Sequence, residues 1–253
     1  MKSIHIVSYN SQTVDRASIA SWFPESFKVV KKHKKPDFII FMDDPGDVNP
    51  FLYNQAKAAH IDINYRLDAL SHKVFHYALN HNIPMVGIGR GATFLAAKSK
   101  AFVFQHVDNH TSVHNIQSNL IGWNSESIMT PSKHSTMIYP YVLKPELFTV
   151  MAWSNGLSSK YLGANKMFFS RNIMHTDAIK KVVTKSLIPQ GTEQRMGFKI
   201  PQRTTVDSIV KETEVVEFKH TNCLCIQGDP SQITFGSYKR FINYIINNFT
   251  KKK

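Results

Sequence analysis

The chain has 253 residues, of which 42% are hydrophobic, and a formal net charge of +13. This length can bury a full core, and α/β folds of this size are often one domain. No apolar run approaches the roughly 20 residues of a membrane-spanning helix, so we expect no membrane association. The charge favours polyanionic partners, but the dense basic runs, 31–35 and 251–253, lack the interleaved aromatic residues of single-strand binders.

The N-terminal half alternates between predicted strands and helices. Apolar segments predict strands at 4–7, 27–30, 37–42 and 84–88, and helical spacing predicts helices at 12–23, 68–80 and 90–98. The unbroken apolarity of 37–42 and 84–88 is typical of parallel strands that are buried on both faces. The order of strands and helices implies right-handed crossovers and a three-layer α/β sandwich.

After residue 101 the predicted strands become shorter, which favours antiparallel additions to the sheet. The sequence predicts strands at 101–107, 127–138, 147–153 and 223–227 and a closing helix at 236–249. The segment 176–186 is ambiguous and is compatible with a helix. No repeat or long linker interrupts the chain. We therefore expect a single domain over 1–250 and a basic tail at 251–253. The two cysteines, Cys223 and Cys225, are too close in sequence to bridge each other readily, which favours a reducing, cytoplasmic setting.

Residues 84–91, PMVGIGRG, join an apolar strand to a helix through a glycine-rich turn. This is the outline of a nucleophile elbow, in which a strained turn lifts a reactive side chain. A cysteine or serine is expected at the tip. The residue there is Gly89, which has no side chain.

The 84–91 segment resembles the P-[VI]-x-G-[IV]-C-R-G elbow of class-I glutamine amidotransferases, and among them most the γ-glutamyl hydrolase branch, peptidase family C26. Further similar segments follow in the family's order: 46–53, 105–107 with His110 and His114, 132–134, 152–154 and 226–231. Together they span about 37–245. The resemblance implies a flavodoxin-like α/β sandwich with a mostly parallel central sheet.

These enzymes cleave glutamine or γ-glutamyl amides through a cysteine thioester, assisted by a histidine and a glutamate. The resemblance maps the three positions onto Gly89, Asp229 and Ser231, so the triad is degenerate. An aspartate is a poor substitute for the histidine, because it repels a thiolate and its ordinary pKa of about 3.9 makes it a weak base.

The loop that supplies oxyanion-binding N–H groups in the family maps onto residues 43–46. Pro45 has no N–H, and Asp44 adds negative charge where an anion would develop. Loss of one such donor typically costs about 10²–10³ in rate. The resemblance therefore implies an inactive site with a remaining pocket. The candidate ligand-binding residues of that pocket are Asp44, Gly46, Asp47, Arg90, Gly91, Gln105, His106, Ser132, His134 and Gln227.

Two interpretations of this pocket remain open. The start of the helix at Arg90 favours anions, so the space beside Gly89 would suit a small carboxylate. Alternatively, Gly89 and Gly91 only satisfy a tight turn. Ser132 and His134, two residues apart, are expected on one face of a polar strand near the pocket.

The remaining reactive side chains carry weaker signals. Cys223 and Cys225 lie on a predicted buried strand, where cysteines are usually inert. His106, His110 and His114 have a spacing of four, which would align them as metal ligands on a helix. The intervening residues disfavour a helix and no cysteine accompanies them. We therefore expect no metal and no cofactor.

The leading hypothesis is a catalytically inactive amidotransferase-like protein that binds a small ligand or a protein partner. The resemblance suggests a synthetase or ligase as that partner, because such enzymes use the ammonia that the family releases. One alternative is an active glutaminase or γ-glutamyl hydrolase with a relocated nucleophile. Another is a basic nucleic-acid-binding protein on the same scaffold. The Lys- and Asn-rich composition is compatible with a bacteriophage protein.

Overall fold

The computed structural model describes residues 2–8, 27–30, 35–58, 61–107, 110, 112–123, 128–131, 134–155, 160–162, 168–170, 211–230 and 236–251. The helices expected at 12–23 and 176–186 lie outside these residues, as does most of the basic run at 31–35.

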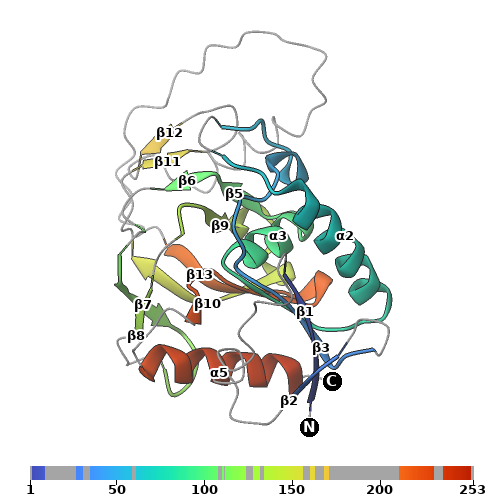
Figure 1. Cartoon of the computed structure of the whole chain (residues 1–253). Helices are drawn as coiled ribbons and strands as arrows, with labels where there is room; N and C mark the ends of the chain where they lie inside the picture. Colours follow the sequence, from blue (N-terminus) through green and yellow to red (C-terminus); the bar gives the residue numbers. More distant parts are fainter. Residues whose placement is uncertain are drawn as a thin grey trace.

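A mixed nine-stranded sheet forms the centre of this described part of the chain (Figure 1). Across the sheet the strands are β2 (Phe27–Val29), β1 (Lys2–Val7), β3 (Phe38–Phe41), β4 (Met85–Ile88), β14 (Cys223–Ile226), β13 (Lys211–Phe218), β10 (Phe148–Asn155), β7 (His114–Ser118) and β8 (Ile128–Thr130). The strands from β2 to β14 run parallel, and those from β13 to β8 pair in antiparallel fashion. The expected sheet, mostly parallel at its core with antiparallel additions, is confirmed.

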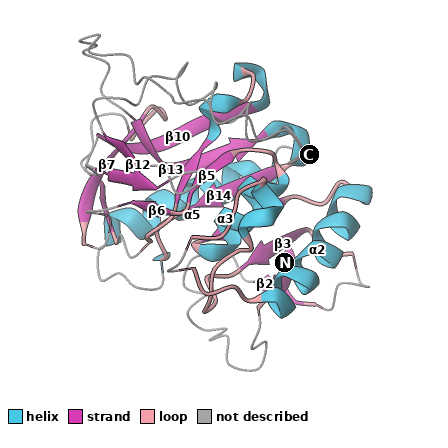
Figure 2. Cartoon of the chain, turned by 90° about the horizontal axis from the view of Figure 1, so that it is seen from above, coloured by secondary structure: helices cyan, strands magenta, loops and turns pink. Residues whose placement is uncertain are grey.

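Helices cover both faces of the sheet, as the two views show (Figures 1 and 2). On one face lie α2 (Tyr65–Asn80) and α3 (Arg90–Lys98), and on the other lies α5 (Gly236–Lys251). Alternate side chains of β3 point to opposite faces of the sheet. Ile39 and Phe41 pack in the core on the side of α2 and α3, whereas Phe38 and Ile40 pack in the core on the side of α5. Because β3, β4 and β14 are buried on both faces, their apolar runs are unbroken.

Several predicted boundaries need correction. The helix predicted at 68–80 begins at Tyr65, because the Asn64 side chain caps it by accepting a hydrogen bond from the Leu67 N–H (3.0 Å). The strand predicted at 101–107 is two short strands, β5 (Phe102–Phe104) and β6 (His106–Val107), with different partners. They pair with β9 (Met137–Tyr139) and β11 (Lys160–Leu162), and β11 also pairs with β12 (Phe168–Ser170).

The segment predicted as one strand at 127–138 is likewise divided between β8 and β9. His134 lies in the connection between them, so its expected place on a strand is wrong. The sequence did not predict β7 and β13. Lys251 of the expected tail is the last residue of α5, and the final two lysines lie outside the described residues. Within the described ranges, none of the helices has the length and apolar composition needed to traverse a lipid bilayer.

Candidate functional site

A cavity of about 120 Å³ opens at the carboxyl ends of β3, β4 and β14. In an open α/β sheet this edge is where ligands bind. The lining residues are Asp43, Asp44, Gly46, Asp47, Val48, Gly89, Arg90, Thr93, Pro131, His134, Ser135, Thr136, Gln227 and Asp229. Three neighbouring strands thus bring together segments that are far apart in the sequence.

The turn at residues 87–91, called the Gly89 turn here, has the geometry of a strained elbow. Gly89 has φ +51° and ψ −114°, a conformation that L side chains rarely adopt. Its N–H donates to the Ile226 carbonyl (2.9 Å), and its carbonyl accepts from the Thr93 N–H (3.1 Å), which joins β4, β14 and α3. A Cβ on Gly91 would collide with the Phe41 carbonyl, so α3 packs directly onto β3.

Asp43, the second residue after β3, fills the space next to Gly89. A Cβ built on Gly89 would collide with the Asp43 carboxyl group. That carboxyl group also accepts a hydrogen bond from the Arg90 N–H (2.8 Å), the first N–H of α3. A side chain at position 89 and an anion at this N–H would both need the volume that Asp43 occupies.

The Asp43 side chain is exposed through the open cavity, but its carboxyl group packs closely against the Gly89 turn. This partial burial raises the pKa of Asp43 above its ordinary value. The hydrogen bond from Arg90 acts in the opposite direction, and the nearby charges of Asp229 and Asp44 raise the pKa further. Asp43 and Asp229 are therefore close enough to interact electrostatically within the cavity.

The backbone N–H of Arg90 lies at the cavity, whereas its side chain is bound to residues of the surrounding structure. Its guanidinium forms a buried ion pair with Asp68 of α2, with an N–O distance of 2.6 Å. The same nitrogen also lies 3.4 Å from the carbonyl of Asn64 and 3.5 Å from that of Asp47. Arg90 thus anchors the loop after β3 to α2, and the guanidinium charge is balanced before any ligand arrives.

The loop after β3 adds further carboxylates to the lining. Asp44 accepts a hydrogen bond from the Ser8 hydroxyl (2.7 Å), and Asp47 accepts one from the Asp62 N–H (2.9 Å). Gly46 has φ +89°, a value that favours glycine. With Asp43 and Asp229, these residues give the cavity four aspartates, and among the described residues that line it the paired Arg90 is the one basic side chain besides His134.

Gln227 and His134 also line the cavity. Gln227 accepts a hydrogen bond from the Ile138 N–H (2.6 Å), and its amide nitrogen lies 3.4 Å from Nε2 of His134. Nδ1 of His134 lies 2.7 Å from the Thr136 carbonyl, which fixes the ring orientation. Of the mapped triad positions, Gly89 and Asp229 both line the cavity, whereas Ser231 lies outside the described residues.

Some predicted pocket residues lie elsewhere. Gln105 is buried away from the cavity, where it binds Gln55 and the backbone of the 56–58 segment. His106 belongs to β6 and is also absent from the lining, and Gly91 serves helix packing instead. Ser132 lies outside the described residues.

Asp43 was not identified as a site residue by the sequence analysis. The signal that could have found it is its position shortly after the buried strand β3, next to the strand that ends in the Gly89 turn.

Cys223 and Cys225 are buried in β14 and do not line the cavity. Burial raises the pKa of Cys223 to about 12, although hydrogen bonds involving Thr221 and Ser99 act in the opposite direction, and burial also raises the pKa of Cys225. Reaction with a disulfide reagent requires the thiolate. We expect both thiols to be unreactive in the native protein at pH 8 and to react fully after unfolding in guanidinium chloride. Rapid stoichiometric labelling of the native protein would show that a thiol is available as a relocated nucleophile.

Comparison with known proteins agrees with this architecture. The sequence profile described as Peptidase C26 matches residues 28–189. A putative GMP synthase subunit from Thermoplasma acidophilum has a similar structure, with a TM-score of 0.54, 14% identity, and coverage of 99% of this chain and 93% of that one. The glutaminase domain of Trypanosoma brucei CTPS, with bound acivicin, has a TM-score of 0.52, 10% identity, and coverage of 100% and 95%. No curated protein matches the sequence. At these identities the structural likenesses establish the fold alone.

Proposed function

Because the chain belongs to the peptidase C26 family, we propose that it is a member without the family's thioester chemistry, which binds a small organic cation in the cavity beside Gly89. The observation that carries this proposal is the position of Asp43. Its carboxyl group occupies the space that a side chain at position 89 would need. It also accepts the hydrogen bond from the Arg90 N–H that an anionic intermediate would require. The turn that would present a nucleophile is filled by a carboxylate.

The charge of the cavity supports a cationic ligand over the small carboxylate expected from the sequence. Four aspartates line it, and the guanidinium of Arg90 is neutralised by Asp68. A carboxylate would meet like charges at short range, whereas an ammonium group would gain charge-assisted hydrogen bonds. The volume of about 120 Å³ is below the roughly 300–1,000 Å³ of pockets for drug-sized ligands. The ligand should therefore be small.

Ligand charge can be tested with butylammonium and butyrate, two probes of similar size and opposite charge. Isothermal titration should detect butylammonium and not butyrate. We expect Asp43→Asn and Asp229→Asn each to weaken binding about tenfold, equivalent to about 1.4 kcal/mol. Asp37→Asn is the matched control, because Asp37 is exposed and precedes β3 at the opposite edge of the sheet. Preferential binding of butyrate would contradict the proposal.

The same titration has an expected pH dependence. Asp43 loses its negative charge as the pH falls through its pKa, and that pKa is raised above 3.8. Affinity for butylammonium should therefore begin to fall at a higher pH than an ordinary aspartate would produce. In Asp43→Asn this part of the pH dependence should disappear. An unchanged profile in that variant would mean that Asp43 does not contact the cation.

Hydrolysis is tested separately with glutamine and a γ-glutamyl amide as substrates. We expect no turnover by the wild-type protein. If turnover occurs and is abolished by Cys223→Ala or Cys225→Ala, the chain is an enzyme with a relocated nucleophile and the proposal is wrong. Butylammonium titration of the same preparation shows that the cavity is folded.

A further inference from the structure

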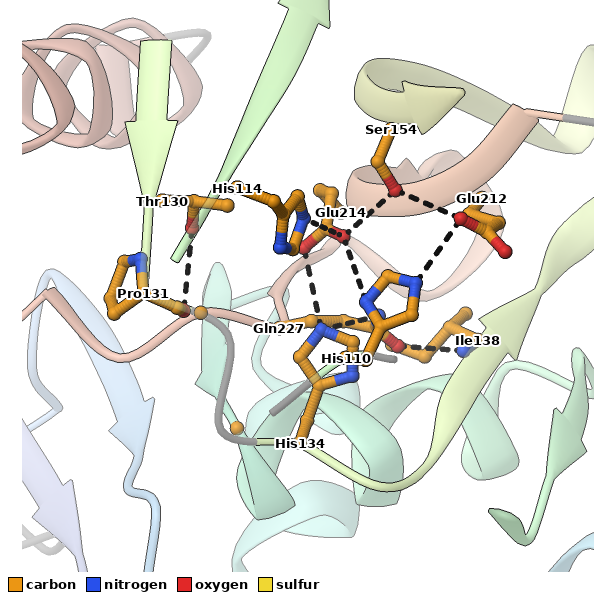
Figure 3. A network of polar contacts seen from close by, with 12 residues as sticks. His110, His114, Thr130, Pro131, His134, Ile138, Ser154, Glu212, Glu214 and Gln227 are labelled. Carbon is orange, nitrogen blue, oxygen red and sulfur yellow. Dashed lines mark hydrogen bonds and ion pairs between the residues drawn. The ribbon is translucent and has the colours of Figure 1, made fainter. Parts of the chain in front are cut away.

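A buried cluster of three histidines and two glutamates lies next to the cavity, and of its five members only His134 lines it (Figure 3). Glu212 and Glu214 point to the same face of β13, two residues apart. His114 is the first residue of β7, and His110 precedes that strand. His134 enters from the connection between β8 and β9 and also lines the cavity. The cluster is therefore assembled from segments that are distant in sequence.

Acceptor oxygens lie close to the ring nitrogens of both His114 and His110 in this cluster. In His114, Nδ1 lies 3.3 Å from the Ser112 carbonyl and Nε2 lies 3.0 Å from Oε1 of Glu214. In His110, Nε2 lies 3.2 Å from Oε2 of Glu212 and Nδ1 lies 3.6 Å from Oε1 of Glu214. A neutral imidazole has one N–H and one lone pair. A neutral His114 ring would therefore direct a lone pair at an acceptor oxygen, unless a cation lies between them.

One choice of tautomers for His110 and His114 directs the lone pairs of both rings at Glu214. If Nδ1 of His114 donates to Ser112 and Nε2 of His110 donates to Glu212, the two remaining nitrogens converge on Oε1 of Glu214. One ligand atom from each of these two histidines and from Glu214 lies within 4.8 Å of the others. Zinc–nitrogen and zinc–oxygen bonds are about 2.0–2.2 Å long, so modest side-chain rotations would bring all three atoms onto one ion.

We propose that His110, His114 and Glu214 bind a divalent transition-metal ion, with Zn²⁺ the best match to two imidazoles and a carboxylate. Glu212 and the Ser112 carbonyl then act as hydrogen-bond acceptors that orient the two histidines. Such carboxylate–histidine–metal and carbonyl–histidine–metal arrangements are usual around metal sites.

Charge and the surrounding polar atoms favour an ion at this point. Glu212 and Glu214 are both fully buried or nearly so, and buried charges require compensation. Among the described residues, Oε2 of Glu214 accepts no hydrogen bond, although Nε2 of His134 lies 3.5 Å away. His134 thus lies where it can complete the coordination, and its place on the cavity wall provides a path for the ion.

The test is a metal titration of the full-length protein after treatment with a chelator. It should use a His76→Gln background, because His72 and His76 are exposed on α2 with ring centroids 4.4 Å apart and can chelate metal at the surface. We expect one equivalent of Zn²⁺ per chain and, with Co²⁺, the visible absorption of a four-coordinate nitrogen–oxygen site. His114→Gln and Glu214→Gln should each weaken binding at least tenfold. His106→Gln, a histidine outside the cluster, should leave affinity unchanged.

Circular dichroism establishes that each variant is folded. The Co²⁺ spectrum of the His76→Gln protein tests the site without any substitution in the cluster, so it remains informative even if a cluster variant fails to fold. Absence of stoichiometric binding in that background would overturn the proposal and leave a network of hydrogen-bonded histidines and carboxylates. Equal affinity in folded His114→Gln would also overturn it, and so would an equal loss in His106→Gln.

Discussion

Replacing Gly89 with cysteine should destabilise the protein by about 2–4 kcal/mol and should produce no turnover of glutamine or a γ-glutamyl amide. The cost has two physical sources. A side chain at φ +51° is strained, and its Cβ would collide with the Asp43 carboxyl group. Turnover should stay absent because Asp229 stands where the resemblance places the histidine base. Denaturant unfolding and an ammonia-release assay measure the two effects.

Two further variants separate strain from collision. In Gly89→Cys combined with Asp43→Gly the carboxyl group is gone, so part of the lost stability should return. Gly122→Ala is the matched control, because Gly122 has φ +87° but no atom within 4 Å of a built Cβ, and it should show the backbone cost alone. A single Gly89→Cys variant as stable as wild type would refute the packing of Asp43 described here.

Removing the partner of Arg90 should have the largest effect on stability. Asp68→Ala leaves a buried guanidinium without its carboxylate, which typically costs about 3–5 kcal/mol. Asp68 also accepts a hydrogen bond from the Asn49 N–H (2.9 Å), so the loop after β3 should loosen as well. At about 2–4 °C per kcal/mol for a chain of this size, Tm should fall by roughly 6–20 °C. Thermal unfolding followed by circular dichroism measures this change.

The double variant Arg90→Met with Asp68→Leu tests the cause of that loss. It removes both charges and keeps apolar volume, so it should be clearly more stable than Asp68→Ala. Glu146→Ala, which removes an exposed carboxylate, should change stability by no more than about 0.5 kcal/mol. If Asp68→Ala resembles Glu146→Ala, the ion pair does not hold the loop as the structure implies.

Local patterns in the sequence were sufficient to predict the parallel core. Residues 37–42 and 84–88 are continuously apolar because β3 and β4 are buried on both faces. The helix at 90–98 was predicted with its observed bounds because the Gly89 turn fixes its start. The same turn also identified the edge of the sheet at which the cavity lies.

Two features depend on contacts between distant residues and were not predictable in this way. Asp43 fills the space beside Gly89 only because β3 and β4 are neighbours in the sheet. Strand β13 escaped prediction because it buries Glu212, Thr213 and Glu214, so its pattern is polar although its position is internal. Those glutamates are stabilised by histidines roughly 100 residues away in sequence.

The histidine cluster was likewise not predictable from the spacing of its residues in the sequence. We expected His110 and His114 to share a face only on a helix, and the structure brings them together without one. Their rings are 5.0 Å apart, with His114 at the start of β7. His106, which has the same spacing, lies on β6 and is not part of the cluster.

The most direct test of the central claim is a comparison of butylammonium binding between the wild-type protein and the Asp43→Asn, Asp229→Asn double variant. We predict saturable binding of the cation to wild type, no measurable binding to the double variant, and no hydrolysis of γ-glutamyl amides by either protein. Equal binding to both proteins, or hydrolysis by the wild-type protein, would contradict the assignment of this cavity as a non-catalytic cation site.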